Sequence, residues 1–234
     1  MDPESRERAA ARLLMDWPTE VEGVLIGGYA VAAYGPPRQS VDLDVVTDER
    51  TRPAWERWLR AHQLMVERRT TFPGKSAAGI SVTNWRGGTV SFDLMVGGVR
   101  DRDSWAVVPA EWILRDPRVG PIELLSGRVE AGVSTVRLEG LWALKLVAGR
   151  PHDIADLFGL TTQAAHLDEV ADLLSSLHGP RIRRKFKTLR TRLSDRKTYV
   201  DSLSRLGAGS PTDSANTTAW QQFIAKVNSV LPTD

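Results

Sequence analysis

The sequence Val24-Leu25-Ile26-Gly27-Gly28 is followed, thirteen residues after the diglycine, by Asp42-Leu43-Asp44-Val45-Val46. Both stretches predict buried β-strands, the first ending in a tight turn and the second carrying two carboxylates. Because side chains alternate along a strand, Asp42 and Asp44 point to one face, about 7 Å apart, while Leu43 points into the core. The run Val90-Ser91-Phe92-Asp93-Leu94-Met95-Val96 predicts a further strand with a third carboxylate, Asp93.

Three carboxylates on neighbouring strands predict a metal site. If the strand of Asp93 pairs beside the other, the carboxylate oxygens converge on one or two hard cations, Mg²⁺ or Mn²⁺, that can hold a nucleoside triphosphate. Gly27 and Gly28 allow backbone N–H groups to approach phosphate oxygens, at the positive end of a helix expected from Tyr29. The plainer alternatives are capping aspartates at a polar strand end and an ordinary strand-to-helix turn. A second Asp-x-Asp, Asp101-Arg102-Asp103, lacks an apolar strand around it and predicts a solvated turn.

The composition is typical of a soluble enzyme with a substantial core. The chain has 234 residues and a net charge of +2. With no cysteine and four scattered histidines, disulfides, thiolate catalysis and a zinc pattern are excluded, so any metal is held by oxygen ligands. Since there is neither an apolar window of about 18 residues nor a signal-peptide pattern, we expect a cytoplasmic protein without a membrane partner.

The order of the expected elements predicts an α+β fold, with a mixed β-sheet core, flanking helices and an all-helical C-terminal region. We expect a catalytic core over residues 1–135 and a helical domain over residues 136–234. Strands are expected at residues 21–26, 41–46, 79–85, 89–96, 105–115 and 127–137, the middle two forming a hairpin that turns at residues 86–88. Helices are expected at residues 9–17, 29–34 and 52–63, then from residue 139 onward, with a polar linker at residues 210–216 before a last helix at residues 220–231.

These motifs together resemble the nucleotidyltransferase superfamily of DNA polymerase beta. The shared pattern is Gly27-Gly28, the run Arg38-x-Ser40-x-Asp42-Leu43-Asp44, and the separate Asp93. Within the superfamily, the chain is most similar to the AbiEii/MenT-type toxin nucleotidyltransferases, because a helix with Lys145 is followed by Arg150 and by an Asp-x-x-Asp made of Asp153 and Asp156. The resemblance covers about residues 20–160.

The resemblance implies transfer of a nucleoside monophosphate from a nucleoside triphosphate to an acceptor. Asp42, Asp44 and Asp93 would bind the metal, with Lys145 and Asp153 as further catalytic candidates. The nucleotide-binding candidates are Gly27, Gly28, Arg38, Ser40, Lys145 and Arg150. Many relatives have Gly-Ser in place of Gly27-Gly28, and a basic residue where this chain has His152. The residues themselves also point to Lys145, because a compact ammonium suits phosphate; a surface lysine whose charge reaches the solvent is the alternative.

Charge is concentrated at residues 181–197, which contain nine basic residues and one acid. This stretch carries a net +8 in a chain of net charge +2, so the remainder is acidic. Apolar residues recur at helical spacing, which predicts a helix with one packed face and one positive surface. Such a surface suits a nucleic-acid backbone, and the binding candidates are Arg181, Arg183, Arg184, Lys185, Lys187 and Arg190. A solvated amphipathic helix is the alternative.

Three functions stay open from the sequence. The first is a nucleotidyltransferase that acts on RNA, most simply at the tRNA 3′ end, as the toxin of a type IV-like toxin–antitoxin system with a separately encoded antitoxin. The second is an antibiotic nucleotidyltransferase that resembles those acting on aminoglycosides or lincosamides. The third is a non-catalytic nucleotide-binding module, which usually lacks one of the carboxylates.

Overall fold

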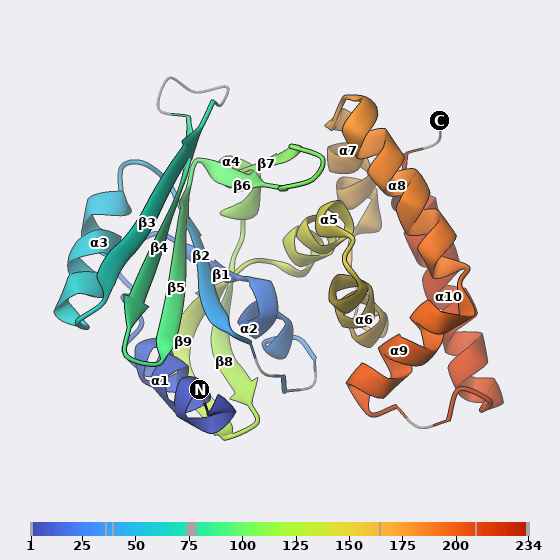
Figure 1. Ribbon diagram of the computed structural model, residues 1–234, viewed down its shortest axis with the longest axis horizontal. Coiled ribbons are helices and arrows are strands. Elements are labelled where there is room, and N and C mark those ends of the chain that lie inside the picture. The colour runs from blue at the N-terminus through green and yellow to red at the C-terminus, as the bar shows by residue number, and fades with distance from the viewer. Residues whose placement is uncertain are drawn as a thin grey trace. The chain divides into compact units, whose positions relative to one another are not determined.

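The computed structural model describes residues 2–35, 37–38, 40–73, 79–163, 165–208 and 210–232, and the chain folds into two compact units (Figure 1). The first unit comprises Met1–Arg100 and Val108–Arg137, and the second comprises Asp101–Val107 and Leu138–Asp234. The sequence expectation of an α+β fold with a mixed sheet and a helical C-terminal region is confirmed.

The first unit is built on a seven-stranded mixed sheet with the order β3-β4-β5-β2-β1-β9-β8. Its strands are β1 Val24–Ile26, β2 Asp42–Thr47, β3 Met65–Phe72, β4 Ile80–Gly87, β5 Val90–Val96, β8 Arg118–Leu124 and β9 Gly127–Thr135. The pairs β2–β5 and β1–β9 are parallel, and the other neighbours are antiparallel. A separate two-stranded sheet joins β6 Gly98–Arg100 to β7 Val107–Pro109.

The described residues of this unit also form the helices α1 Pro3–Met15, α2 Gly27–Ala32, α3 Arg52–Ala61 and α4 Ala110–Ile113. The fully buried Trp55 of α3 packs its ring 6.0 Å from that of Phe92 on β5, and Trp17 meets Trp55 edge-on at 5.0 Å. Since residues alternate along β5, the face opposite Phe92 carries Asp93. The aromatic core on one side of the sheet therefore fixes which side presents the carboxylates.

The second unit consists of helices: α5 Leu138–Ala148, α6 Pro151–Gly159, α7 Leu167–Ser176, α8 Pro180–Leu193, α9 Arg196–Leu206 and α10 Ser214–Val230. Its core gathers aromatic rings, with Phe158 edge-on to Trp220 at 5.0 Å and Phe223 at 5.5 Å from Phe158. Helix α10 begins earlier than residue 220, because the Asp213 side chain accepts the N–H of Ala215 and caps it.

One expected strand is wrong, and it is followed by a strand that the sequence did not predict. The expected strand at residues 105–115 is only β7 followed by α4, because Pro109 has no N–H with which to continue a strand ladder. The next strand is β8, which contains Pro121 and an irregular register between Gly120 and Ile122. Proline argues against a central strand, but β8 lies at the sheet edge, where the missing N–H costs little.

The strand β3 was not predicted at all. It is the opposite edge of the sheet, and most of its residues are exposed, so its sequence shows no alternation of apolar and polar residues. Its partner β4 forms the expected hairpin with β5, but Gly87 lies opposite Val90, so the turn is at residues 88–89 and not at residues 86–88.

Candidate functional site

The three predicted metal ligands lie together. Asp42 and Asp44 are on the same face of β2, and β5 runs parallel to β2 with Asp93 directly opposite Asp44. One carboxylate oxygen from each residue lies within 4.8 Å of the other two, and all three residues are partly buried. Two parallel strands, far apart in the sequence, thus bring three negative charges to one point of the sheet face.

Asn84 is a site residue that the sequence argument missed. It lies on β4 opposite Asp93, and its Nδ2 donates a hydrogen bond to Asp93 Oδ1 at 2.7 Å. The bond fixes the rotamer of Asp93 and leaves the carboxylate charge in place. The hairpin register could have revealed it, because a turn that pairs Gly87 with Val90 also pairs Asn84 with Asp93.

The donor set fits a small divalent cation. Mg²⁺ takes oxygen ligands at about 2.1 Å, so two ligands of one ion lie roughly 3–4 Å apart. The carboxylate oxygens of Asp42, Asp44 and Asp93 lie within 4.8 Å of one another, so small rotations about their side-chain bonds reach that spacing. Three clustered carboxylates repel one another, and a cation relieves this repulsion.

The diglycine lies against the same cluster. Gly27 has φ +72°, and a Cβ atom there would lie 2.1 Å from Oδ2 of Asp44. A Cβ atom on Gly28 would lie 2.5 Å from Oγ of Ser40 and 3.3 Å from a terminal nitrogen of Arg38. Only glycine therefore fits at these two positions. The backbone of residues 27 and 28 thus lies beside the carboxylate of Asp44, the hydroxyl of Ser40 and the guanidinium of Arg38, which are all predicted site residues.

The segment before β2 is tied to the cluster by weak hydrogen bonds. Ser40 Oγ donates to Asp42 Oδ1 at 3.5 Å, and the Tyr29 hydroxyl donates to the Ser40 carbonyl at 3.4 Å. Burial, together with the charge of Glu7, raises the pKa of Tyr29 to about 12. Tyr29 therefore stays protonated at neutral pH and remains a donor to this segment. The neighbouring Pro36 and Gln39 lie outside the described residues.

The second unit holds the other predicted group. Lys145 of α5 donates from Nζ to Asp153 Oδ1 at 3.0 Å and to Asp156 Oδ2 at 2.7 Å, both on α6. The side chains of Lys145 and Asp153 are 7% and 0% exposed, so this is a buried ion-pair cluster. The alternative of a lysine whose charge reaches the solvent is therefore wrong.

Asp153 also stabilises the first turn of helix α6. It accepts the backbone N–H of Arg150 at 3.2 Å and Nε of the same residue at 2.7 Å. Burial pushes the pKa of Asp153 upward, but the charge of Lys145 and the Arg150 hydrogen bond outweigh it and hold the pKa below its ordinary value. The pKa of His152 is lowered, mainly by burial, so His152 is uncharged at neutral pH.

Helix α8 carries the predicted nucleic-acid surface, and its cations are of two kinds. Four of them are engaged within the second unit. Lys185 is 12% exposed and bonds Asp101 at 2.7 Å, and Arg181 lies over the Trp105 ring at 3.4 Å. Arg190 donates to the carbonyl of Pro232 at 2.7 Å, and Arg192 to that of Gly149 at 2.8 Å.

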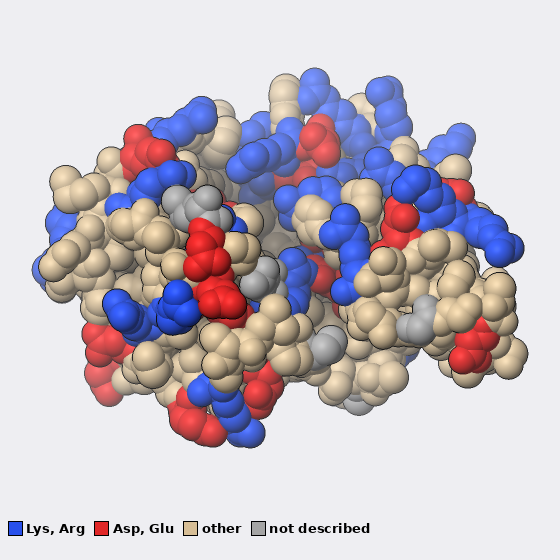
Figure 2. Space-filling view, turned by 60° about the horizontal axis from the view of Figure 1, so that its bottom comes forward, with Lys and Arg blue, Asp and Glu red and all other residues tan. Residues whose placement is uncertain are grey.

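The remaining cations of α8 are Arg183, Arg184 and Lys187. All are exposed, and none has an ion pair or side-chain hydrogen bond with any residue that the structure describes. Figure 2 shows Lys and Arg side chains gathered over the right-hand unit, with few Asp or Glu side chains among them. The surface that could bind a nucleic acid thus contains fewer exposed cations than the sequence predicted, because Lys185 forms an intramolecular ion pair.

That ion pair also corrects the expectation of a solvated turn at residues 101–103. Asp103 is 79% exposed, but the side chain of Asp101 is 11% exposed and accepts hydrogen bonds from Lys185 and from Ser104. Burial raises the pKa of Asp101, but its hydrogen bonds from Lys185 and Ser104 outweigh this and lower it overall. This Asp-x-Asp therefore serves to attach the segment to α8.

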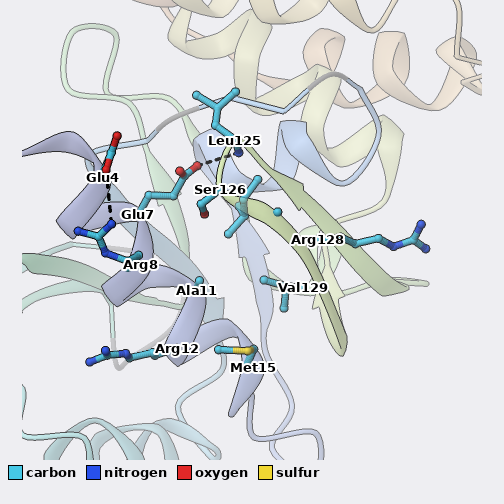
Figure 3. Close-up of a pocket in the computed structure, with 12 residues that line it drawn as sticks. Glu4, Glu7, Arg8, Ala11, Arg12, Met15, Leu125, Ser126, Arg128 and Val129 are labelled. Carbon is cyan, nitrogen blue, oxygen red and sulfur yellow. Dashed lines mark hydrogen bonds and ion pairs between the residues drawn. The ribbon is translucent and has the colours of Figure 1, made fainter.

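A cavity of about 770 Å³ lies elsewhere in the first unit, between α1 and the turn that joins β8 to β9 (Figure 3). The buried Glu7 accepts the backbone N–H of Leu125 at 2.9 Å and thereby holds α1 against that turn. Glutamates and arginines both line the cavity, so it has no dominant charge, and none of the predicted site residues belongs to it.

Among the helices of the described chain, none combines the length and the apolar character that crossing a bilayer requires. No protein-family model matches the chain, and no curated protein sequence matches it either.

Comparison with solved structures found weak similarity over most of the chain. JHP933 from Helicobacter pylori is 17% identical, with a TM-score of 0.44 over 97% of this chain and 90% of that one. A candidate nucleotidyltransferase from H. pylori is 16% identical, with the same score over 97% and 92% of the two chains. ANT(2")-Ia in complex with adenylyl-2"-tobramycin is 16% identical, with a TM-score of 0.34 over 86% and 98%. Similarity at these scores identifies no family, so functional conclusions rest on the site itself.

Proposed function

We propose that the protein is a metal-dependent nucleotidyltransferase, which moves a nucleoside monophosphate from a nucleoside triphosphate to an acceptor. The observation that carries this proposal is the convergence of Asp42, Asp44 and Asp93, whose oxygens lie within 4.8 Å of one another. A polar strand end needs no third carboxylate from another strand. A diglycine packed against Asp44 adds a phosphate-binding backbone to the same place.

The reaction is an in-line displacement at the α-phosphorus. The acceptor oxygen forms a bond to phosphorus, the bond to the bridging oxygen of the β-phosphate breaks, and pyrophosphate leaves. Asp42, Asp44 and Asp93 would hold divalent cations, which would neutralise the charge that develops on the phosphates and lower the pKa of the acceptor hydroxyl. Asp93, oriented by Asn84, accepts the proton of that hydroxyl in this proposal.

Two groups of residues are proposed to bind phosphate, and each is argued from its own surroundings. The backbone N–H groups of Gly27 and Gly28, with Ser40 and Arg38 beside them, are proposed to hold the triphosphate. Lys145 and Arg150 are proposed to add positive charge, with Asp153 and Asp156 holding Lys145 in one rotamer. Asp153 then acts as a positioning residue.

The proposed acceptor is RNA, most simply a tRNA 3′ end. Arg183, Arg184 and Lys187 support this choice, because exposed cations without an intramolecular partner are suited to a phosphate backbone. The order Lys145, Arg150, Asp153 and Asp156 resembles the AbiEii/MenT-type enzymes, which supports a role as a toxin controlled by a separately encoded antitoxin.

The test is incubation of the purified protein with each α-labelled nucleoside triphosphate, total RNA and Mg²⁺ or Mn²⁺. We expect label in RNA, and no label with Asp44→Asn. Asp103→Asn, from the other Asp-x-Asp, is the matched control and should behave as the parent. Label in an added aminoglycoside but not in RNA would support the antibiotic-modifying alternative. No transfer to RNA, protein or small molecule under any condition would overturn the proposal.

A further inference from the structure

A second, smaller cavity lies within the helical unit and is lined by residues from the end of α7, from the segment after it and from α8. Its volume is about 350 Å³. Its polar lining consists of Ser175, His178, Arg183 and Arg190, and its apolar lining includes Leu177 and Phe186. Among the described residues, no carboxylate lines it, and the two guanidinium groups contribute positive charge.

Helical periodicity explains why these arginines face the cavity. Arg183 and Arg190 are seven residues apart, which is nearly two turns, so they lie on the same flank of α8. The other flank carries Arg181, Lys185 and Arg192, and each of these is engaged by another part of the second unit. The two flanks therefore differ in role. One flank attaches α8 to other parts of the second unit, and the other presents positive charge to the cavity.

Two backbone carbonyl groups hold the side chain of Arg190 in place. One of its terminal nitrogens donates to the carbonyls of Leu231 and Pro232, at 3.1 and 2.7 Å. A guanidinium with one nitrogen bound in this way retains other N–H groups for a ligand, and its side chain is already ordered. Arg183, by contrast, is exposed and has no partner among the described residues.

The lining combines a positive rim with an apolar surface, which together suit a ligand that has both an anionic and a flat apolar part. A volume of about 350 Å³ is near the lower limit of ligand pockets, roughly 300 Å³. It is large enough for one nucleotide and too small for a folded RNA element. A nucleotide carries the required phosphate and a base with an apolar face.

We propose that this cavity binds one nucleotide of the single-stranded part of the RNA acceptor. The phosphate lies against Arg183 and Arg190, and the base lies against Leu177 and Phe186. The inference deepens the proposed function and rests on it for the identity of the acceptor. The exposed cations Arg184 and Lys187 then add attraction for the backbone without forming a pocket.

The test measures binding alone, with no metal and no nucleoside triphosphate added. The probe is a fluorescein-labelled single-stranded RNA hexanucleotide, and its dissociation constant is measured by anisotropy. We expect Arg183→Gln to weaken binding about tenfold, as for removal of one charge-assisted hydrogen bond. The matched control is Arg184→Gln, which removes the same charge from the same helix outside the cavity and should weaken binding only about twofold.

A second pair of variants separates shape from charge. Ser175→Trp fills the cavity without changing any charge and should weaken binding, whereas Thr188→Trp on the exposed side of α8 should not. Adenosine monophosphate should compete with the probe in the parent protein better than inorganic phosphate does. Thermal melting confirms that each variant is folded.

Equal effects of Arg183→Gln and Arg184→Gln, or normal binding by Ser175→Trp, would overturn the subsite. Equal competition by phosphate and by the nucleotide would overturn the role of the apolar lining. Failure of the proposed function gives a different result, namely no transfer of label in any assay, whatever the cavity variants do to RNA binding.

Discussion

Gly27 lies so close to Asp44 that a Cβ atom on residue 27 would stand 2.1 Å from the Oδ2 atom of that aspartate. The strand β1 ends at Ile26, so the chain turns directly beneath a carboxylate of β2. The same contact connects the two motifs that are thirteen residues apart in the sequence. In the proposed reaction, it places the phosphate-binding backbone next to the metal ligands.

Gly27→Ala should therefore abolish transfer, because the added methyl group displaces Asp44. A shift of about 1 Å at a reacting centre costs about a hundredfold in rate. The matched control is Gly88→Ala, since Gly88 also has a positive φ, +56°, but nothing within 4 Å of its Cβ position. Both variants should lose about 1 kcal/mol of unfolding free energy from backbone strain. Equal transfer rates in the two variants would contradict the role of this contact.

Asp42→Asn, Asp44→Asn and Asp93→Asn should each reduce transfer by about a hundredfold or more, since an amide keeps the shape but loses the charge that the cation needs. Each variant should stay folded, because removing one of three clustered charges relieves repulsion. Mn²⁺ should raise the melting temperature of the parent and not of the variants. If all three retain transfer well above a hundredth of the parent rate, the carboxylates do not bind the catalytic metal.

Lys145→Ala should lower the free energy of unfolding by about 3–5 kcal/mol, because it leaves Asp153 and Asp156 buried without their common partner. Weaker nucleotide binding in this variant alone would thus have two explanations. The control is the double variant Lys145→Ala/Asp156→Asn, which removes one stranded charge and should regain part of the stability. Calorimetry should show that nucleotide affinity stays low in it; recovery of affinity would exclude a phosphate contact by Lys145.

The stability that Asp153 contributes should depend on pH in one direction. Its folded-state pKa lies below the ordinary value of 3.8, so the contribution is fully present above that value and is lost as the pH falls toward the folded pKa. Asp153→Asn should be much less stable than the parent at pH 7, and the difference should shrink as the pH falls below about 4. Urea unfolding at pH 7, 5 and 3 measures this, and a constant difference would contradict it.

Replacing Arg183, Arg184 and Lys187 with Gln should weaken RNA modification and flatten its salt dependence. The log-log slope should fall by about 0.7 for each RNA phosphate that the variant no longer neutralises. Binding of metal and nucleoside triphosphate at the carboxylates of Asp42, Asp44 and Asp93 should be unchanged. Lys185 is left intact, because Lys185→Gln would strand the nearly buried Asp101 and destabilise the fold. If the triple variant modifies RNA normally at physiological salt, the exposed cations of α8 do not bind RNA, and an acceptor other than RNA is favoured.

Much of this arrangement follows from the sequence by itself. Alternation along β2 placed Asp42 and Asp44 on one face, and the apolar residues around Asp93 predicted its strand. Helical spacing of Ile182, Phe186, Leu189 and Leu193 predicted the buried side of α8, and all four are buried. These patterns are local, since each depends only on the period of one element.

Only the tertiary structure decided which partners these residues meet. The edge strands β3 and β8 escaped prediction, because an edge strand needs neither a buried alternating face nor every N–H. Asp101 and Lys185 are 84 residues apart, so nothing in the local sequence separates this buried ion pair from a solvated turn and an exposed lysine. Likewise, the parallel alignment of Asp44 with Asp93 depends on contact between strands that are distant in the chain. The burial of Lys145 between Asp153 and Asp156 depends on the packing of α5 against the next helix, α6. The residue types and their spacing along each helix or strand determined which chemical groups are present. Long-range packing decided which of the charged groups form ion pairs within the protein and which stay exposed to a ligand.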